Sequence, residues 1–258
     1  MRAISYNILA QRYVRDFPAV TNLEILSWDY RLSLILKAIA AENADLILLQ
    51  EVELETFEVD FASLFASYSF CRHIVDKNRK NQIGNVIMWR NHLVPLGSDD
   101  LSRMDRRMVP QNQTLTSCSV IVEFDTFWVA NVHLKAQIRQ GETQRQTQIR
   151  SVLKKLNHQK AGFIAGDFND FLDSKCLYDV KILGLVMAEL APYDLKIHSH
   201  LNSAYVFSNE YGHNYWTFDH VLSNKMVVTL KEPSETELIP FPNETEPSDH
   251  LMVVFEFV

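Results

Sequence analysis

The chain has 258 residues, of which 47% are hydrophobic and 22% are charged, and its formal net charge is −7. This composition is typical of a globular protein with a complete core, and the negative charge argues against a long basic track for duplex nucleic acid. With 7 glycines, no glycine-rich phosphate loop is expected, and the 3 widely spaced cysteines favour reduced core thiols over a zinc site.

Taken in chain order, the segments alternate between helices and strands, and several strands are joined as hairpins. Apolar residues at helical spacing predict one helix over residues 28–42, with Ser27 as a cap, and a second over residues 142–157. Strands are predicted at residues 45–50, 85–89, 119–124, 127–134, 162–165, 219–223, 225–230 and 251–257. No repeat, linker or Gly-x-Gly-x-x-Gly turn interrupts this order. We therefore expect one domain over residues 1–258, an α/β fold in which two packed, mostly antiparallel sheets are flanked by helices.

Polar residues stand where six of the apolar segments end or begin. They are Asn7, Glu51, His133, Asp167 with Asn169, Asp219, and the triplet Ser248-Asp249-His250. Each position alone could be a turn residue or a cap. Together they supply carboxylates, carboxamides and imidazoles. Phosphodiester hydrolysis needs such groups for charge compensation, for a polarised water and for a stabilised leaving oxygen.

The segment around Asp167 carries the strongest local signal. Asp167 and Asn169 are two residues apart, so their side chains point the same way in an extended backbone. Mg²⁺ prefers oxygen ligands and keeps several waters, so one or two carboxylates are enough to hold it. Glu51 is the best candidate for direct ligation, and the carboxamides of Asn7 and Asn169 could bind phosphate or orient a metal-bound water.

The imidazole of His250 would need a carboxylate to orient it. Asp249 is its neighbour in the sequence, but adjacent side chains of a strand point apart. Asp219, which opens an earlier predicted strand, is therefore the alternative partner.

Five segments resemble the endonuclease/exonuclease/phosphatase superfamily, and their order and rough spacing match over essentially the whole chain. They are Ser5–Ala10, Leu49–Glu53, Asn131–Ala136, Gly166–Asn169 and Pro247–His250. The segments most similar to nocturnin and the deadenylases of the carbon-catabolite-repressor type are Tyr6–Gln11, His133–Ala136 and Leu201–Tyr205. The resemblance implies a four-layer α/β sandwich. It also implies that a site at one end of the sheets depends on Mg²⁺, or on Mn²⁺ in its place.

The resemblance also implies roles in binding the metal ion and the phosphate. Glu51 would hold the metal ion, with Asn7 and Asp219 supporting the metal site. His133 would contact the scissile phosphate. Whether one or two ions act stays open.

Further roles concern the attacking water and the transition state. Asp167 would position or activate the water, and Asn169 would stabilise the transition state. His250, beside Asp249 in the last motif, would be the imidazole that acts on the phosphate.

Five residues are expected to contact the substrate: Lys135, Asn85, Arg139, Tyr215 and Trp216. Lys135 and Arg139 lie in a basic stretch, which is either a local landing site for phosphates or a solvated helix face. Tyr215 and Trp216 lie in a segment read as a polar loop, where they either stack on bases or cover a sheet edge. Asn85 is expected to line the site.

The expected function is that of a Mg²⁺-dependent 3′→5′ exoribonuclease that shortens single-stranded RNA, above all poly(A) tails, and releases 5′-nucleotides. The first alternative is a phosphatase for a small nucleotide such as NADP(H) or a short oligoadenylate. Gln137 stands where nocturnin-like proteins carry an Arg, which argues against a strict NADP(H) 2′-phosphatase. The second alternative is an inactive binding module, and the complete set of polar residues argues against it.

No apolar run reaches the length of about 20 residues that a membrane-spanning helix needs. A strand-like segment begins almost at the N-terminus, so no signal or transit peptide is expected. We therefore expect an intracellular protein, in the cytoplasm, that acts as a monomer on single-stranded RNA or a nucleotide.

Overall fold

The computed structural model contains two six-stranded sheets and a two-stranded hairpin in the part of the chain that it describes. The described residues are 1–14, 20, 22–73, 82–101, 119–136, 142–170, 193, 195–199, 203–208, 212–231 and 241–258. Arg139, Gln137 and the first two residues of the segment Leu201–Tyr205 lie outside them.

The first sheet combines strands from both ends of the chain. Its strand order is β13 (Val228–Leu230), β14 (Val253–Phe257), β1 (Arg2–Asn7), β2 (Leu46–Glu53), β4 (Ile83–Arg90) and β3 (Tyr68–Arg72). β1 and β2 run parallel, whereas the other neighbouring pairs of this sheet are antiparallel.

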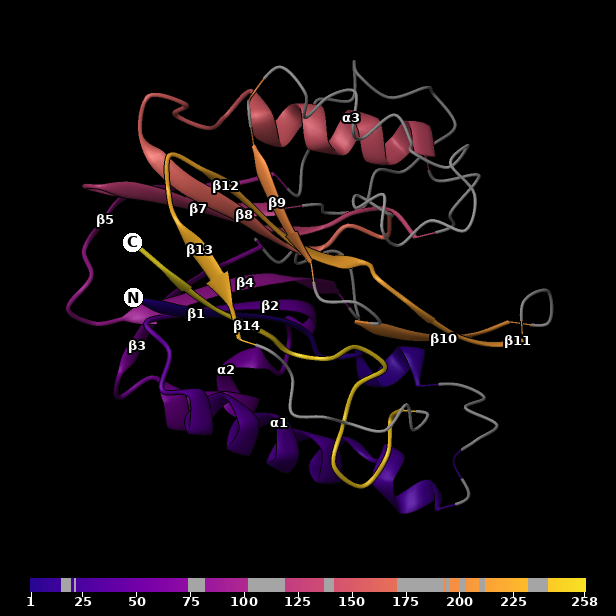
Figure 1. The fold of residues 1–258 in the computed structure, drawn as a ribbon. Helices are drawn as coiled ribbons and strands as arrows, with labels where there is room; N and C mark the ends of the chain where they lie inside the picture. Colours follow the sequence, from indigo (N-terminus) through magenta and orange to yellow (C-terminus); the bar gives the residue numbers. More distant parts are fainter. Residues whose placement is uncertain are drawn as a thin grey trace.

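The second sheet is built from the middle of the chain. Its strand order is β5 (Pro95–Asp100), β6 (Ser119–Phe124), β7 (Phe127–His133), β8 (Ala161–Asp167), β12 (Asp219–Asn224) and β9 (Lys196–Ser199). Here β7 and β8 form the parallel pair, and the other neighbours are antiparallel. A hairpin of β10 (Ala204–Ser208) and β11 (Gly212–Trp216) extends away from the sheets (Figure 1).

Apolar side chains on both faces of each sheet hold four layers together. The α-helices of the described residues are α1 (Trp28–Glu42), α2 (Phe57–Asp60) and α3 (Glu142–Leu153). Successive strand residues face opposite sides, so Leu46 and Leu48 of β2 pack between the sheets while Ile47 and Leu49 pack toward the helices. α1 and α2 cover the outer face of the first sheet, and α3 covers that of the second (Figure 1). The expected four-layer α/β sandwich is therefore confirmed.

The predicted strands and helices are found, but the end of β2 differs from the expectation. The strand predicted at residues 45–50 continues to Glu53. Its register against β4 shifts between Leu49 and Val52, which marks a β-bulge. Glu51 thus lies inside a bulged strand rather than after the strand.

Other predicted elements also differ; the strand expected over residues 225–230, for example, is β13, which begins at Val228. The helix predicted over residues 142–157 ends at Leu153. The segment that holds Tyr215 and Trp216 was expected to be a polar loop, but it is β11, which pairs with β10 along its whole length. Backbone hydrogen bonds to a neighbouring strand stabilise this hairpin, and a polar composition does not reveal them.

No helix within the described ranges is long and apolar enough to cross a membrane. Cys71, the cysteine that those ranges include, is a half-buried free thiol, and burial raises its pKa. That residues 1–258 form one domain stays a prediction.

Candidate active site

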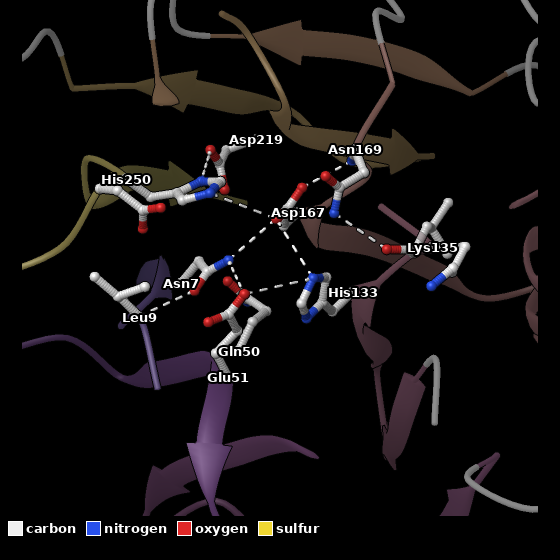
Figure 2. A network of polar contacts seen from close by, with 12 residues as sticks. Asn7, Leu9, Gln50, Glu51, His133, Lys135, Asp167, Asn169, Asp219 and His250 are labelled. Atoms are coloured by element: carbon white, nitrogen blue, oxygen red, sulfur yellow. Dashed lines mark hydrogen bonds and ion pairs between the residues drawn. The ribbon is translucent and has the colours of Figure 1, made fainter. Parts of the chain in front are cut away.

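Four of the expected residues stand near the carboxyl ends of the two parallel strand pairs. Asn7 ends β1, Glu51 lies two residues before the end of β2, His133 ends β7 and Asp167 ends β8. The carboxyl ends of two parallel strands lie at the same edge of a sheet. The two edges lie at the same end of the sandwich, where Asn7 of the first sheet contacts Asp167 of the second, and the four side chains point toward one another (Figure 2).

Gly166 allows β7 and β8 to approach each other at this end. Its φ is +143°, and a Cβ atom there would lie 1.9 Å from the carbonyl oxygen of Val132. Any side chain would therefore push the strands apart where His133 and Asp167 are register partners. The glycine before Asp167 is thus required for the close approach of these two residues.

Asp167 lies at the centre of the site and is 1% exposed. Its Oδ2 accepts a hydrogen bond from Asn7 Nδ2 at 3.1 Å, and the Nε2 atoms of His133 and His250 each lie 3.6 Å from the same oxygen (Figure 2). Its Oδ1 accepts a hydrogen bond from the backbone N–H of Asn169 at 2.8 Å. Burial raises the pKa of Asp167, against the opposing effect of the two imidazoles. A higher pKa makes the carboxylate a better proton acceptor for a water molecule.

Asp219, rather than the adjacent Asp249, orients His250. The ring atom Nδ1 of His250 lies 2.8 Å from Oδ2 of Asp219. Burial alone lowers the pKa of His250, but Asp219 and Asp167 outweigh burial, so the pKa lies well above its usual value. The ring is therefore held as a charged hydrogen-bond donor that faces Asp167. Asp249 is half-buried, and burial raises the pKa of its carboxyl group.

Glu51 adopts an unusual backbone conformation that turns its carboxylate into the site. Its φ is +57°, in the left-handed region that residues other than glycine rarely adopt. Oε1 accepts a hydrogen bond from Asn7 Nδ2 at 3.3 Å, and Oε2 accepts one from the backbone N–H of Ala10 at 3.0 Å. The side chains of Glu51 and His133 are 14% and 20% exposed and are 3.9 Å apart. This side of the site is the more open one.

Two carboxamides brace the site from opposite sheets. Nδ2 of Asn7 donates to both Glu51 and Asp167, so Asn7 links the two carboxylates across the sheets. Asn169 also has a left-handed backbone, with a φ of +49°, and its Nδ2 donates to the carbonyl oxygen of Leu134 at 3.1 Å. The expected action of Asn169 on the transition state stays a prediction.

The residues around Glu51 fit a hard divalent cation. Mg²⁺ needs one or two carboxylates and fills its other positions with water and substrate oxygens. Within the described ranges, no group of three His, Cys, Asp or Glu side chains is arranged to hold an ion. Oδ2 of Asp219 already contacts His250 and a serine hydroxyl, and Oδ1 of Asn7 accepts the backbone N–H of Leu9. These two atoms therefore have protein partners already. Ligation of the ion by Glu51, Asn7 or Asp219 stays a prediction.

The basic stretch after β7 is partly internal. Arg145 of α3 is 1% exposed, and its Nε lies 3.2 Å from Oδ2 of Asp170, so its guanidinium does not face a substrate. Arg145 and Gln148 instead bind the backbone of Lys135, at its carbonyl oxygen and its N–H. The side chain of Lys135 is half-buried, and its expected phosphate contact stays a prediction. Arg139 lies outside the described residues.

The other expected substrate contacts lie in different settings. Asn85 is 1% exposed, and its Nδ2 donates to the carbonyl oxygen of Asn131. This hydrogen bond joins the two sheets, and the amide group of Asn85 is not presented at the surface. Trp216 is half-buried and meets the ring of Phe218 edge-on, with ring centroids 5.3 Å apart. Tyr215 lies in β11, and its side chain is outside the described part.

Arg31 supports the site although no role was expected for it. It lies on α1, is 0% exposed, and donates hydrogen bonds to the carbonyl oxygens of Ile8, Leu9 and Pro247. Arg31 therefore ties the segment after β1 to the segment that leads to the last motif. Its position four residues before Ile35, on the buried face of α1, was the available signal in the sequence.

Ser203 also supports the site without an expected role. Its hydroxyl donates to Oδ2 of Asp219 at 2.8 Å. The sequence placed it in the Leu201–Tyr205 motif, but a motif does not say what a hydroxyl contacts.

Known proteins resemble this chain in sequence and in fold. A family model described as the Endonuclease/Exonuclease/phosphatase family matches residues 4–250. The Ccr4 3′-5′-exoribonuclease subunit of the CCR4-Not complex from Schizosaccharomyces pombe is 42% identical over 60 residues, which cover 23% of this chain and 9% of that protein. The matched stretches cover 9% to 34% of the length of the curated relatives.

Solved structures share the fold. ANGEL2, described as a 2′,3′-cyclic phosphatase, superposes with a TM-score of 0.70 at 19% identity, over 99% of this chain and 94% of that one. The human Nocturnin catalytic domain superposes with a TM-score of 0.66 at 22% identity, over 100% and 93% of the two chains. The chain therefore belongs to the Endonuclease/Exonuclease/phosphatase family, and parts of it are similar to Ccr4 exoribonuclease subunits.

Proposed function

We propose that this chain is a metal-dependent phosphodiesterase that removes nucleotides from the 3′ end of single-stranded RNA, with poly(A) as its preferred substrate. The observation that carries hydrolysis is Asp167, a buried proton acceptor in contact with Asn7 and faced by His133 and His250. The choice of RNA rests on the similarity to the Ccr4 exoribonucleases.

In this proposal different residues of the site perform the separate tasks of hydrolysis. Asp167 accepts the proton of the attacking water while Asn7 keeps its carboxylate in place. His250, charged through its pair with Asp219, donates a hydrogen bond to a phosphate oxygen, and His133 contacts the same phosphate from the open side. When bound at Glu51, Mg²⁺ or Mn²⁺ supplies the positive charge that offsets the charge of the phosphate.

A second candidate function is that of a phosphatase acting on the end of an RNA or on a small nucleotide such as NADP(H). The observation that favours it is the structural likeness to ANGEL2, which is described as a 2′,3′-cyclic phosphatase. The same residues would serve both reactions, because both need an activated water and a stabilised phosphate. The two candidates differ in which ester bond is placed beside Asp167.

The decisive experiment incubates the protein and Mg²⁺ with three substrates: oligoadenylate labelled at its 5′ end, the same RNA ending in a 2′,3′-cyclic phosphate, and NADPH. Stepwise shortening of the labelled RNA is expected, and EDTA should abolish it. Opening of the cyclic phosphate or release of phosphate from NADPH, without shortening, would favour the second candidate. Asp167→Asn protein serves as the inactive control, and no reaction with any substrate would contradict both candidates.

The cellular setting is part of the proposal. We propose a monomer that meets its RNA or nucleotide substrate in the cytoplasm. Light scattering on the purified chain and fractionation of cells that express it would test the two statements separately.

A further inference from the structure

Ser203 makes three hydrogen bonds at the site through its hydroxyl group. It is 0% exposed, and its Oγ accepts hydrogen bonds from the backbone N–H groups of Phe218 and Asp219, at 3.1 and 3.0 Å. A hydroxyl has two acceptor positions and one proton. Because both acceptor positions are occupied, the proton is directed to the remaining partner, Oδ2 of Asp219, 2.8 Å away.

The backbone of Ser203 joins the segment that carries His250. Its carbonyl oxygen accepts the N–H of Leu251 at 2.7 Å, and the next residue, Ala204, forms a β-bridge with His250. Ser203 therefore contacts the start of β12, which holds Asp219, and the residue that follows His250.

Oδ2 of Asp219 receives two donors at the same distance. The hydroxyl of Ser203 and Nδ1 of His250 each lie 2.8 Å from it. Two donors fix the direction of this oxygen better than one, and the direction of the oxygen fixes the plane of the imidazole ring. The ring in turn places Nε2 at 3.6 Å from Asp167.

We propose that Ser203 is a positioning residue that fixes the carboxylate of Asp219 and, through it, the ring of His250. The proposal rests on the proposed function, because positioning has a purpose only if His250 acts on a phosphate. Ser203 does not act as a nucleophile, since it is buried and its lone pairs and its proton are all engaged.

The test compares Ser203→Ala with Ser223→Ala in the hydrolysis of labelled oligoadenylate or whichever of the three substrates the wild-type protein converts. Ser223 is a matched control on the same strand as Asp219: it is 1% exposed, and its hydroxyl lies 3.1 Å from Nε2 of His198, away from the site. We expect Ser203→Ala to lower kcat about tenfold with KM nearly unchanged, and Ser223→Ala to leave both nearly unchanged.

A double-mutant cycle separates positioning from general packing. In Asp219→Ala protein, the additional change Ser203→Ala should cause no further loss of kcat, because its target carboxylate is gone. An equal loss in both backgrounds would overturn the proposal. Should Ser203→Ala fail to fold, Ser203→Cys, which keeps a weak donor of similar shape, should lower kcat by less than about tenfold in the wild-type background and cause no further loss in Asp219→Ala protein.

A spectroscopic measurement keeps the test independent of turnover. In protein with ¹⁵N-labelled histidine, the Nδ1–H resonance of His250, assigned with His250→Asn, should shift in Ser203→Ala and stay in place in Ser223→Ala. An unchanged resonance together with unchanged kcat would refute the role of Ser203. Absence of any hydrolysis by the wild-type protein would refute the proposed function, while the resonance would still report on Ser203.

Discussion

The site has a closed half and an open half. The closed half consists of Asp167, Asp219, His250 and Ser203, and the side chains of its two acids are each 2% exposed while that of His250 is 10% exposed. The open half consists of Glu51 and His133, whose side chains are 14% and 20% exposed. Direct hydrogen bonds join Ser203, Asp219 and His250, whereas the ring of His133 stays 3.6 Å or more from both neighbouring carboxylates.

The difference indicates which groups are ready before substrate arrives. Dipoles that are already oriented need no reorganisation during the reaction, and their effect is stronger away from water. A half with exposed oxygen and nitrogen atoms leaves room for an ion and a phosphate. We therefore expect changes in the closed half to lower the rate itself, and changes in the open half to weaken binding of the metal ion and the substrate.

The largest effect is expected for Asp167→Asn, which removes the proton acceptor at almost constant volume. We expect kcat to fall by about 10³-fold, because a general base typically contributes about 10²- to 10⁴-fold and the charge facing His250 is lost as well. Rates on labelled oligoadenylate measure the effect, and circular dichroism checks the fold. Asp125→Asn in the exposed β6–β7 turn is the control. A fall of less than tenfold would contradict the assignment of Asp167.

Arg31→Met tests the connection between the segment after β1 and the segment that leads to the last motif. The change leaves three buried carbonyl oxygens without this donor, those of Ile8, Leu9 and Pro247. With a cost of about 1 kcal/mol or more for each, the free energy of unfolding should fall by about 3 kcal/mol. Urea denaturation measures it. Lys37→Met, at an exposed position of the same helix, should change it by less than about 0.5 kcal/mol.

In the open half, Glu51→Gln should act on the metal ion more than on the rate. The amide keeps an oxygen that can accept from Asn7 but loses the negative charge that attracts Mg²⁺. The Mg²⁺ concentration for half-maximal activity should rise about 10- to 100-fold. Titration of activity with Mg²⁺ and calorimetric titration of the ion measure this shift. An unchanged Mg²⁺ requirement together with a lower kcat would contradict metal binding by Glu51. Its carboxylate would then act on the rate, as the closed half does.

The sequence predicted the members of the site better than the contacts among them. Strand ends and motif order were enough to select Asn7, His133 and Asp167, because parallel strands bring their carboxyl ends to one edge. The partner of His250 stayed open between Asp249 and Asp219. Only the antiparallel pairing of β12 with β8, which sets Asp219 opposite Asp167, decides it.

The sequence did not predict the residues that support the site, and the reason is a different one. Arg31 interrupts an apolar helix face, and whether such a charge is buried depends on carbonyl groups that lie far away in the sequence. Asn85 looked like a residue lining the site, but it turns inward to Asn131. Burial of a polar side chain depends on partners that only the packing of the two sheets brings within reach.

The smallest expected effect concerns a histidine beneath the open half. His73 is 1% exposed; its Nδ1 accepts the backbone N–H of Asn85 at 3.0 Å, and its Nε2 lies 3.0 Å from the carbonyl oxygen of Ser119. This arrangement requires the neutral ring, with the proton on Nε2. Protonation of Nδ1 would break the bond from Asn85, whose side chain contacts the strand that ends in His133.

Burial lowers the pKa of His73 below its usual value near 6.5, although Asp100 opposes the shift. Below about pH 6.5, His73 therefore binds more protons in the unfolded chain than in the folded chain. Its contribution to the free energy of unfolding is complete above about pH 6.5 and is lost as the pH falls. The loss should approach about 1.4 kcal/mol per pH unit. Urea denaturation between pH 7.5 and 5.5 should show a flatter dependence for His73→Gln than for the wild-type protein. Equal slopes of the free energy of unfolding against pH would mean that the open half does not depend on a neutral His73. The open half would then differ from the closed half only in its exposure.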